Sequence, residues 1–177
     1  MTMFFDFLEP LETIKLKLLN GKEVSIKLAR WFFQKYDSTP LLDLSKTYLS
    51  KPLVKYNASY TFAELAILGE FINHGWEGCW IDSFHKKIWN AFPATSLPIQ
   101  LPQEIQIKLS NLLIGKKITK IGAWDILAWK DDFLLFIESK SLYSKDKLRN
   151  SQLSFLQKAL RAGFDSNHFL IVEWDFK

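Results

Sequence analysis

The sequence predicts a mixed α/β domain in which helices flank a central β-sheet. Segments with alternating or continuous apolar residues, typical of strands, are interspersed with segments of helical periodicity. At 177 residues the chain is long enough for one substantial core and too short for two. Apolar residues make up 48% of the chain and include seven tryptophans, a composition typical of a folded protein.

The N-terminal part is expected to begin with a β-hairpin. Apolar and polar residues alternate on both sides of Asn20-Gly21, a dipeptide typical of a type I′ turn, so residues 13–28 are predicted to form two paired strands. Residues 29–37 are expected to be helical. Residues 38–58, rich in Ser, Pro and Tyr, are expected to connect this part to the rest of the chain.

The remaining elements follow the order helix, strand, helix, strand, strand, helix, strand, which predicts helices packed around a mixed sheet. They are a helix over 61–74 ended by Gly75, a strand over 79–84, a loop over 93–98, a helix over 103–114, a hairpin over 122–140, a helix over 146–162 ended by Gly163, and a strand over 169–176. We therefore expect an N-terminal β-hairpin and helix extension over 1–58 and a core domain over 59–177.

Charge and cysteine content restrict the class of protein. The formal net charge of +4 and the pI of about 9.0 permit nucleic-acid binding and equally fit a basic soluble protein. The single cysteine, Cys79, excludes an internal disulfide and a zinc site built from several cysteines, and fits a reducing compartment. The N-terminus lacks signal-peptide features, and no apolar run approaches about 18 residues. We expect a cytoplasmic protein without a membrane segment.

The hairpin over 122–140 carries charged residues where packing favours apolar side chains. Residues two apart on a strand share a face of the sheet. If Asp131-Asp132 is the turn, Asp125 lies opposite Glu138, and Lys140 lies on the same face at the open end of the hairpin.

These three charged groups suit metal-dependent phosphodiester chemistry. Two opposed carboxylates repel each other unless a cation lies between them, and their hard oxygens suit Mg²⁺ or Mn²⁺. Lys140 would point into the same space, where it could orient or activate a water molecule for attack on a phosphodiester. The alternative is that Asp125, Glu138 and Lys140 form a salt-bridged cluster without chemistry.

Two further polar residues lie where apolar ones are expected. Gln152 is near the middle of the apolar face of the last helix, so its amide needs a polar partner. That partner is either the site or its substrate, or a backbone group. Glu64 projects from a largely apolar side of the first helix, and is either a third metal-binding carboxylate or part of a capping box that begins at Thr61.

Basic residues precede Gln152 on the same segment. Lys145, Lys147 and Arg149 are candidates for contacts with nucleic-acid phosphates, and a solvated helix face is the alternative. Other chemistry has little support, because the three histidines lack metal-ligand spacing and no Gly-rich phosphate loop precedes a helix.

This arrangement resembles the PD-(D/E)XK nuclease superfamily and, within it, the virus-type replication-repair nuclease (VRR-NUC) domain. The matching elements are an acidic helix ended by Gly75, then Gly122-Ala-Trp-Asp125, then Ile137-Glu138-Ser-Lys140, and then a helix that bears Gln152 and is ended by Gly163. The resemblance covers about residues 60–175. This chain departs from the family pattern at Trp124, where the family usually has proline.

The resemblance implies a restriction-endonuclease-like core in which Asp125 and Glu138 bind Mg²⁺ or Mn²⁺, Lys140 is catalytic, and Glu64 and Gln152 assist. The expected function is divalent-metal-dependent hydrolysis of phosphodiester bonds in DNA, selective for branched or flapped structures, with RNA as the alternative polymer. The alternative function is a catalytically silent nucleic-acid-binding or assembly module on the same fold. The N-terminal hairpin is expected to serve either substrate choice or dimerisation, which would give a homodimer.

Overall fold

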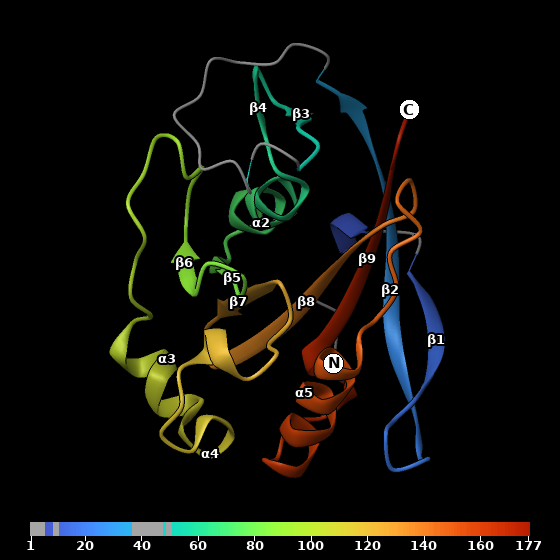
Figure 1. Ribbon diagram of the computed structural model, residues 1–177, viewed down its shortest axis with the longest axis vertical. Coiled ribbons are helices and arrows are strands. Elements are labelled where there is room, and N and C mark those ends of the chain that lie inside the picture. Colours follow the sequence, from blue (N-terminus) through green and yellow to red (C-terminus); the bar gives the residue numbers. More distant parts are fainter. Residues whose placement is uncertain (1–5, 9–10, 37–47, 49–50) are drawn as a thin grey trace.

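The computed structural model describes residues 6–8, 11–36, 48 and 51–177 (Figure 1). Within these residues, nine strands form one sheet of order β4-β3-β2-β9-β8-β7-β5-β6, with β1 paired to β2. The sheet is mixed, because β9 runs parallel to both of its neighbours while β7 and β8 are antiparallel. No helix in the described ranges is long and apolar enough to cross a membrane. The predicted mixed α/β class is confirmed.

The elements have the following bounds. The strands are β1 (Glu12–Lys17), β2 (Glu23–Lys35), β3 (Val54–Tyr56), β4 (Ser59–Thr61), β5 (Glu77–Asp82), β6 (Lys87–Trp89), β7 (Ile126–Lys130), β8 (Phe133–Ser141) and β9 (Phe169–Phe176). The α-helices are α2 (Ala63–Asn73), α3 (Gln103–Lys108), α4 (Ser110–Leu113) and α5 (Asn150–Arg161). Short 3-10 helices are η1 (Asp6–Leu8), η2 (Ile118–Lys120) and η3 (Ser166–His168).

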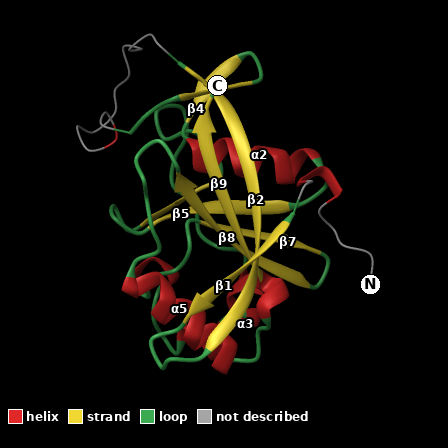
Figure 2. Ribbon diagram, turned by 90° about the vertical axis from the view of Figure 1, so that its right-hand side faces the viewer, coloured by secondary structure: helices red, strands yellow, loops and turns green. Residues whose placement is uncertain are grey.

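Helices cover both faces of the sheet (Figures 1 and 2). On one face, Leu68 and Phe71 of α2 belong to the same core as Ile137 of β8. On the other face, Phe155 of α5 packs edge-on against Phe136, with 5.1 Å between the ring centroids. The neighbours Phe136 and Ile137 thus enter opposite cores, because side chains alternate along a strand. Burial of each such side chain contributes about 1.5–3 kcal/mol.

Strand β8 is the centre of the part of the sheet that carries the charged residues. It lies between β7 and β9. Both of its faces are covered, which is why its first half, Phe133–Ile137, is a continuous apolar run. The run ends at Glu138, so the charged residues begin where the strand leaves the two cores.

The register predicted for the central hairpin is confirmed. Asp131 and Asp132 form a two-residue turn, Lys130 pairs with Phe133, and Ile126 pairs with Ile137. Extending this register by one residue brings Asp125 beside Glu138, although β7 itself begins after Asp125.

The helix predicted over 29–37 is wrong, because β2 continues without a break to Lys35. Ala, Arg, Gln and Lys in this stretch favour a helix locally, but the segment pairs with β9 as far as Phe33 and then with β3. Trp31 faces Trp174 and Phe33 faces Phe176 in this pairing, and such aromatic cross-strand contacts favour a strand. The segment expected to be an extension therefore contributes a strand to the main sheet.

Other differences concern the boundaries of elements. The first hairpin has a longer turn than the two residues predicted, because Lys17 pairs with Glu23 and the Leu18 N–H donates to the carbonyl of Lys22. The helix expected over 103–114 is divided at Leu109 into α3 and α4. The sequence does not predict β6, or β4 just after the expected linker. Strand β3 falls within the linker expected over 38–58. Residues 38–47 and 49–50 of that linker lie outside the described residues.

The loop before Asp125 is held tightly against the start of α5. Trp124 is fully buried, and its indole N–H donates to the backbone carbonyl of Gln152 at 3.2 Å. Gly122 has a φ of 73°, and a Cβ atom there would lie 2.8 Å from the backbone oxygen of Ser151. The backbone can therefore approach the helix this closely only with glycine at this position.

We predict that Gly122→Ala lowers the free energy of unfolding more than Gly115→Ala. Both glycines have positive φ, 73° and 72°, but a Cβ at Gly115 meets nothing within 4 Å. Gly115→Ala should therefore cost only the left-handed backbone strain, about 1–2 kcal/mol. Gly122→Ala should cost at least about 1 kcal/mol more, because the added methyl group collides with backbone. Urea unfolding of the two variants measures this difference, and equal losses would contradict it.

Candidate functional site

A cleft of about 430 Å³ opens where β5 and β8 end and where α2 and α5 begin. We call it the carboxylate cleft. Charged residues from six separate segments of the chain line it: Lys51, Glu64, Asp82, Asp125, Glu138, Lys140, Asp146 and Arg149. The structure therefore brings together Asp125, Glu138, Lys140 and Glu64, which the sequence singled out.

Glu138 is the most enclosed of these groups, with 0% of its surface exposed. Its Oε1 atom is 2.8 Å from the ammonium of Lys140 and also accepts a hydrogen bond from the side-chain amide of Gln152. Its Oε2 atom is buried and has no hydrogen-bond partner among the described residues. An unsatisfied buried carboxylate oxygen is costly, so this atom calls for a proton or a cation.

Asp125 lies directly beside Glu138. Its Oδ2 atom accepts a hydrogen bond of 3.1 Å from the backbone N–H of Ser139, which fixes the carboxylate against β8. The carboxylate of Asp125 is close enough for its negative charge to act on the pKa of Glu138. When both are ionised they repel each other across a site with little water.

Burial and like charge shift both acids in the same direction. The pKa of Glu138 is raised well above its usual value, first by burial and then by the negative charge of Asp125. The pKa of Asp125 is also raised, first by burial and then by Glu64, while Lys51 and Lys140 partly oppose the shift. A divalent cation between these carboxylates would favour their charged forms.

Lys140 is held by three side chains. Its ammonium contacts Glu138, the side-chain oxygen of Gln152 at 3.3 Å and the carboxylate of Asp146 at 3.3 Å. Burial lowers the pKa of Lys140, but the carboxylates of Glu138, Asp125 and Asp146 raise it by more, so that it lies above the usual value for lysine. The side chain is therefore a fixed positive charge at the wall of the cleft.

Gln152 connects the start of α5 to the charged residues of β8. Its side-chain oxygen accepts a hydrogen bond of 2.9 Å from the backbone N–H of Arg149, just before the helix. The same oxygen accepts from Lys140, and its amide nitrogen donates to Glu138. Both partners considered from the sequence, the site and a backbone group, are thus present.

Glu64 does not form the capping box that the sequence allowed. Helix α2 begins after Phe62, which makes no side-chain cap hydrogen bond, and Glu64 forms a 2.5 Å ion pair with Lys51. Lys51 also lies 5.0 Å from the ring centre of Trp80. Burial lowers the pKa of Lys51, but Glu64, Asp125 and Asp82 raise it by more. A cationic side chain thus already balances part of the negative charge in the cleft.

The basic residues expected at the start of the last helix lie before it. Helix α5 begins at Asn150 rather than near residue 146, so Lys145, Lys147 and Arg149 belong to the exposed loop that follows β8. Of these three, Arg149 lines the carboxylate cleft. Their contact with phosphates stays a prediction.

Three charged residues of the cleft were not identified from the sequence. Asp82 ends β5, and an acidic residue directly after an apolar strand could have indicated a site residue. Lys51 and Asp146 lie in irregular segments, where no sequence pattern indicates a site residue. The oxygens of Asp82 are occupied, because Oδ2 accepts from the Tyr48 hydroxyl and is 2.7 Å from Nδ1 of His85. Asp82 therefore holds the β5–β6 turn in place rather than offering a free ligand.

The chain was compared with family models, curated proteins and solved structures. None of these matches it. The resemblance to the PD-(D/E)XK superfamily therefore rests on the order and spacing of the chain's own residues, and the geometry of the cleft must support any functional conclusion.

The donor groups of the carboxylate cleft suit a divalent metal that has few protein ligands. Among the described residues, no three His, Cys, Asp or Glu side chains form a ready metal cage, and Glu64 is engaged by Lys51. Mg²⁺, however, is usually bound through one or two carboxylates and completes its coordination with waters and substrate phosphates. Asp125 and Glu138, with the unsatisfied Oε2 atom, fit that requirement.

We predict that Asp125→Asn stabilises the metal-free protein at neutral pH, because it removes one of two like charges in the cleft. The pKa values of both native carboxyl groups are raised, so above about pH 4 the folded protein binds more protons than the unfolded protein. The free energy of unfolding therefore falls as the pH rises from about 4 through the raised pKa values. Asparagine removes the charge and can keep the hydrogen bond from Ser139.

Thermal unfolding in EDTA at pH 4 and pH 7.5 measures this effect. The gain should be present at pH 7.5 and absent at pH 4, where the native carboxyl groups are protonated. Glu77→Gln, which neutralises an exposed carboxylate on β5, is the matched control and should change stability little at either pH. Destabilisation by Asp125→Asn at pH 7.5 would contradict the proposed repulsion.

Proposed function

We propose that this protein is a divalent-metal-dependent nuclease that hydrolyses phosphodiester bonds in DNA, with a preference for branched or flapped structures. The observation that carries the proposal is the pair of adjacent carboxylates, Asp125 and Glu138, in an open cleft with a fixed lysine ammonium beside them. The order of these residues along the chain, which resembles the PD-(D/E)XK pattern, supports the same assignment.

Each residue has a task that follows from its position. Asp125 and Glu138 would hold Mg²⁺ or Mn²⁺, with Glu64 as a third ligand once its ion pair with Lys51 opens. The cation, when bound, supplies positive charge that offsets the charge developing on the scissile phosphate. Gln152 keeps the side chains of Glu138 and Lys140 in fixed orientations through its two hydrogen bonds.

Lys140 is placed to act on the substrate or on the attacking water. Its ammonium reaches the cleft from the same strand as Glu138, and the amide and carboxylate groups around it restrict its rotamers. Preorganised positive charge of this kind stabilises a phosphoryl transition state without reorganisation during the reaction. Arg149, at the wall of the same cleft, can contact a neighbouring phosphate.

A nucleic-acid-binding or assembly module without turnover is the second candidate. The observation that favours it is the Lys51–Glu64 ion pair, which supplies a cation within the cleft without any metal. The two candidates differ in whether a divalent ion binds at Asp125 and Glu138, and that difference can be measured directly.

We predict cleavage of DNA that is abolished by EDTA and restored by Mg²⁺ or Mn²⁺, because the carboxylates bind the ion only when they are ionised. A panel of labelled single-stranded, duplex, flapped and four-way-junction substrates, with matching RNA strands, would identify the substrate. Glu138→Gln and Asp125→Asn should remove turnover while the fold is kept.

Asp132→Asn is the matched control for these variants. It neutralises a fully exposed carboxylate in the turn of the same hairpin, so its cleavage rate should equal that of the unmodified chain. Undiminished cleavage in EDTA, or by both site variants, would reject this nuclease site. Metal binding at the carboxylates without any cleavage would favour the silent module.

A separate prediction concerns Lys140. Lys140→Ala should lower the single-turnover rate by roughly 10²-fold or more, a loss typical of general acid–base or electrostatic groups, with little change in DNA affinity. Lys140→Arg keeps the charge but changes its shape and effectively cannot release a proton. Arginine should not restore the rate, because the slot between Glu138, Gln152 and Asp146 holds an ammonium. A fully active arginine variant would rule out proton transfer by Lys140.

A further inference from the structure

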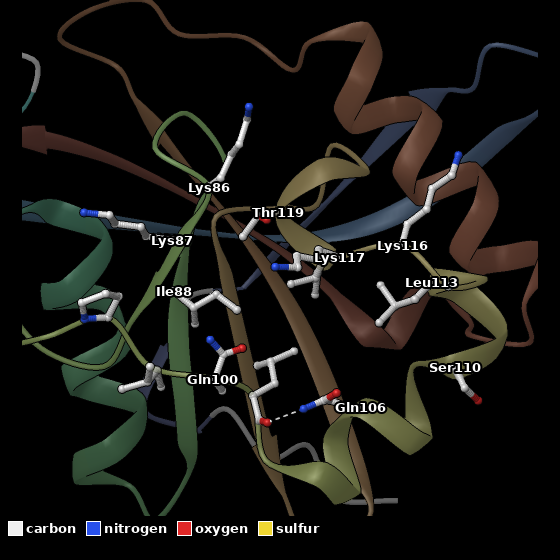
Figure 3. Close-up of a pocket in the computed structure, with 15 residues that line it drawn as sticks. Lys86, Lys87, Ile88, Gln100, Gln106, Ser110, Leu113, Lys116, Lys117 and Thr119 are labelled. Atoms are coloured by element: carbon white, nitrogen blue, oxygen red, sulfur yellow. Dashed lines mark hydrogen bonds between the residues drawn. The ribbon is translucent and has the colours of Figure 1, made fainter.

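A second and larger cleft, of about 530 Å³, adjoins the same β5–β6 turn as the carboxylate cleft (Figure 3). We call it the lysine cleft. One wall is formed by β6 and the end of the turn before it, and carries Lys86 and Lys87. The other wall is formed by the segment between α4 and η2, and carries Lys116 and Lys117. In Figure 3 the side chains of Lys86 and Lys116 extend toward the same side of the cleft, and Lys117 lies between the two walls.

The charge of this cleft is of one sign. No aspartate or glutamate lines it, and none of the four lysines forms an ion pair with a described carboxylate. All four are exposed. The ammonium of Lys87 lies 5.5 Å from the ring centre of Trp89, and in Figure 3 its side chain extends away from the cleft, so Lys86, Lys116 and Lys117 carry the charge of the cleft. A cluster of uncompensated cations around a hollow surface attracts polyanions.

The lining suits an extended strand better than a single small anion. No arginine is present to grip one phosphate in the bidentate manner, and the lysines are distributed over both walls as separate point charges. Apolar side chains, including Ile88, Leu113 and Ile118, and the hydroxyl of Thr119 lie among them. The partly exposed Ile88 and Leu113 can contact the sugars of a strand whose phosphates meet the lysines.

An exposed aromatic residue lies in the turn that the two clefts share. Phe84, at the β5–β6 turn, has 76% of its surface exposed and lines the carboxylate cleft, whereas Lys86 of the same turn lines the lysine cleft. Asp82 fixes this turn through its contacts with the backbone N–H and the ring of His85. A strand that crosses the turn would meet Phe84, and base–aromatic stacking requires an unpaired base.

We infer that the lysine cleft binds the phosphate backbone of a single-stranded nucleic-acid segment, and that Phe84 stacks on one of its bases as the strand passes toward Asp125 and Glu138. The direction toward the carboxylates rests on the proposed nuclease function, whereas the binding itself does not. Single-stranded character fits the flaps and branches expected of the substrate.

The test is binding of a fluorescent oligothymidine in EDTA, measured by anisotropy over a range of salt concentrations. The triple variant Lys86→Gln, Lys116→Gln and Lys117→Gln should weaken binding at least tenfold at low salt. It should also make the slope of log affinity against log salt shallower by about 2, because each phosphate contact on a single strand contributes about 0.7. Phe84→Ala should weaken binding about tenfold without changing that slope.

A second triple variant is the control. Lys15→Gln, Lys17→Gln and Lys22→Gln remove the same charge from exposed positions of the β1–β2 hairpin, away from the cleft, and should change affinity less than twofold. The single charge reversal Lys117→Glu tests the cleft with one substitution if the triple variant does not fold. Equal losses in the two triple variants would overturn the inference.

Two further outcomes separate the possible ligands and functions. If inorganic polyphosphate competes as well as the oligonucleotide per phosphate and Phe84→Ala has no effect, the cleft binds anions generally and the inference is wrong. Because cleavage plays no part in the anisotropy assay, absence of nuclease activity would reject the proposed function and leave this result standing. If the lysine variants cleave DNA and bind the oligothymidine as tightly as the unmodified chain, the inference about the lysine cleft is wrong and the proposed nuclease function stands.

Discussion

Two carboxyl groups of like charge lie side by side at the end of a central strand, that of Glu138 fully buried and that of Asp125 half-buried. Every nearby polar group is arranged around that repulsion. Lys140, on the same strand, and the amide of Gln152, on α5, contact Glu138, and Lys51 forms an ion pair with Glu64 of α2. The protein therefore retains an arrangement that costs stability, and such arrangements are concentrated at functional sites.

The charged strand and its partner could be predicted because the information is local. A two-residue turn fixes which residues of β7 and β8 face each other, and the change from apolar to charged residues at Glu138 marks where the strand leaves the cores. The position of Gln152 on an apolar helix face likewise required a polar partner nearby, and the structure supplies it.

What could not be predicted depends on contacts between distant parts of the chain. Residues 29–35 have a helical composition and become a strand because β9 pairs with them. Lys51 reaches the cleft from an irregular segment that has no periodicity to read. Trp124, in place of the proline usual in the resembled family, is explained only by its burial and its hydrogen bond to the carbonyl of Gln152, which ties the loop before Asp125 to α5.

The position of β9 between β2 and β8 has a consequence for the order in which the molecule can fold. Strand β9 is parallel to both neighbours, and its pairing with β2 joins residues near the two ends of the described chain. Closing so long a loop is entropically costly before any contact compensates for it, and folds dominated by such contacts form slowly. During synthesis the edges of β2 and β8 that pair with β9 would stay unpaired until β9 is made, and unpaired edges promote aggregation. The charged residues at the end of β8 and the lysines of β2 would then oppose the pairing of these edges with other chains.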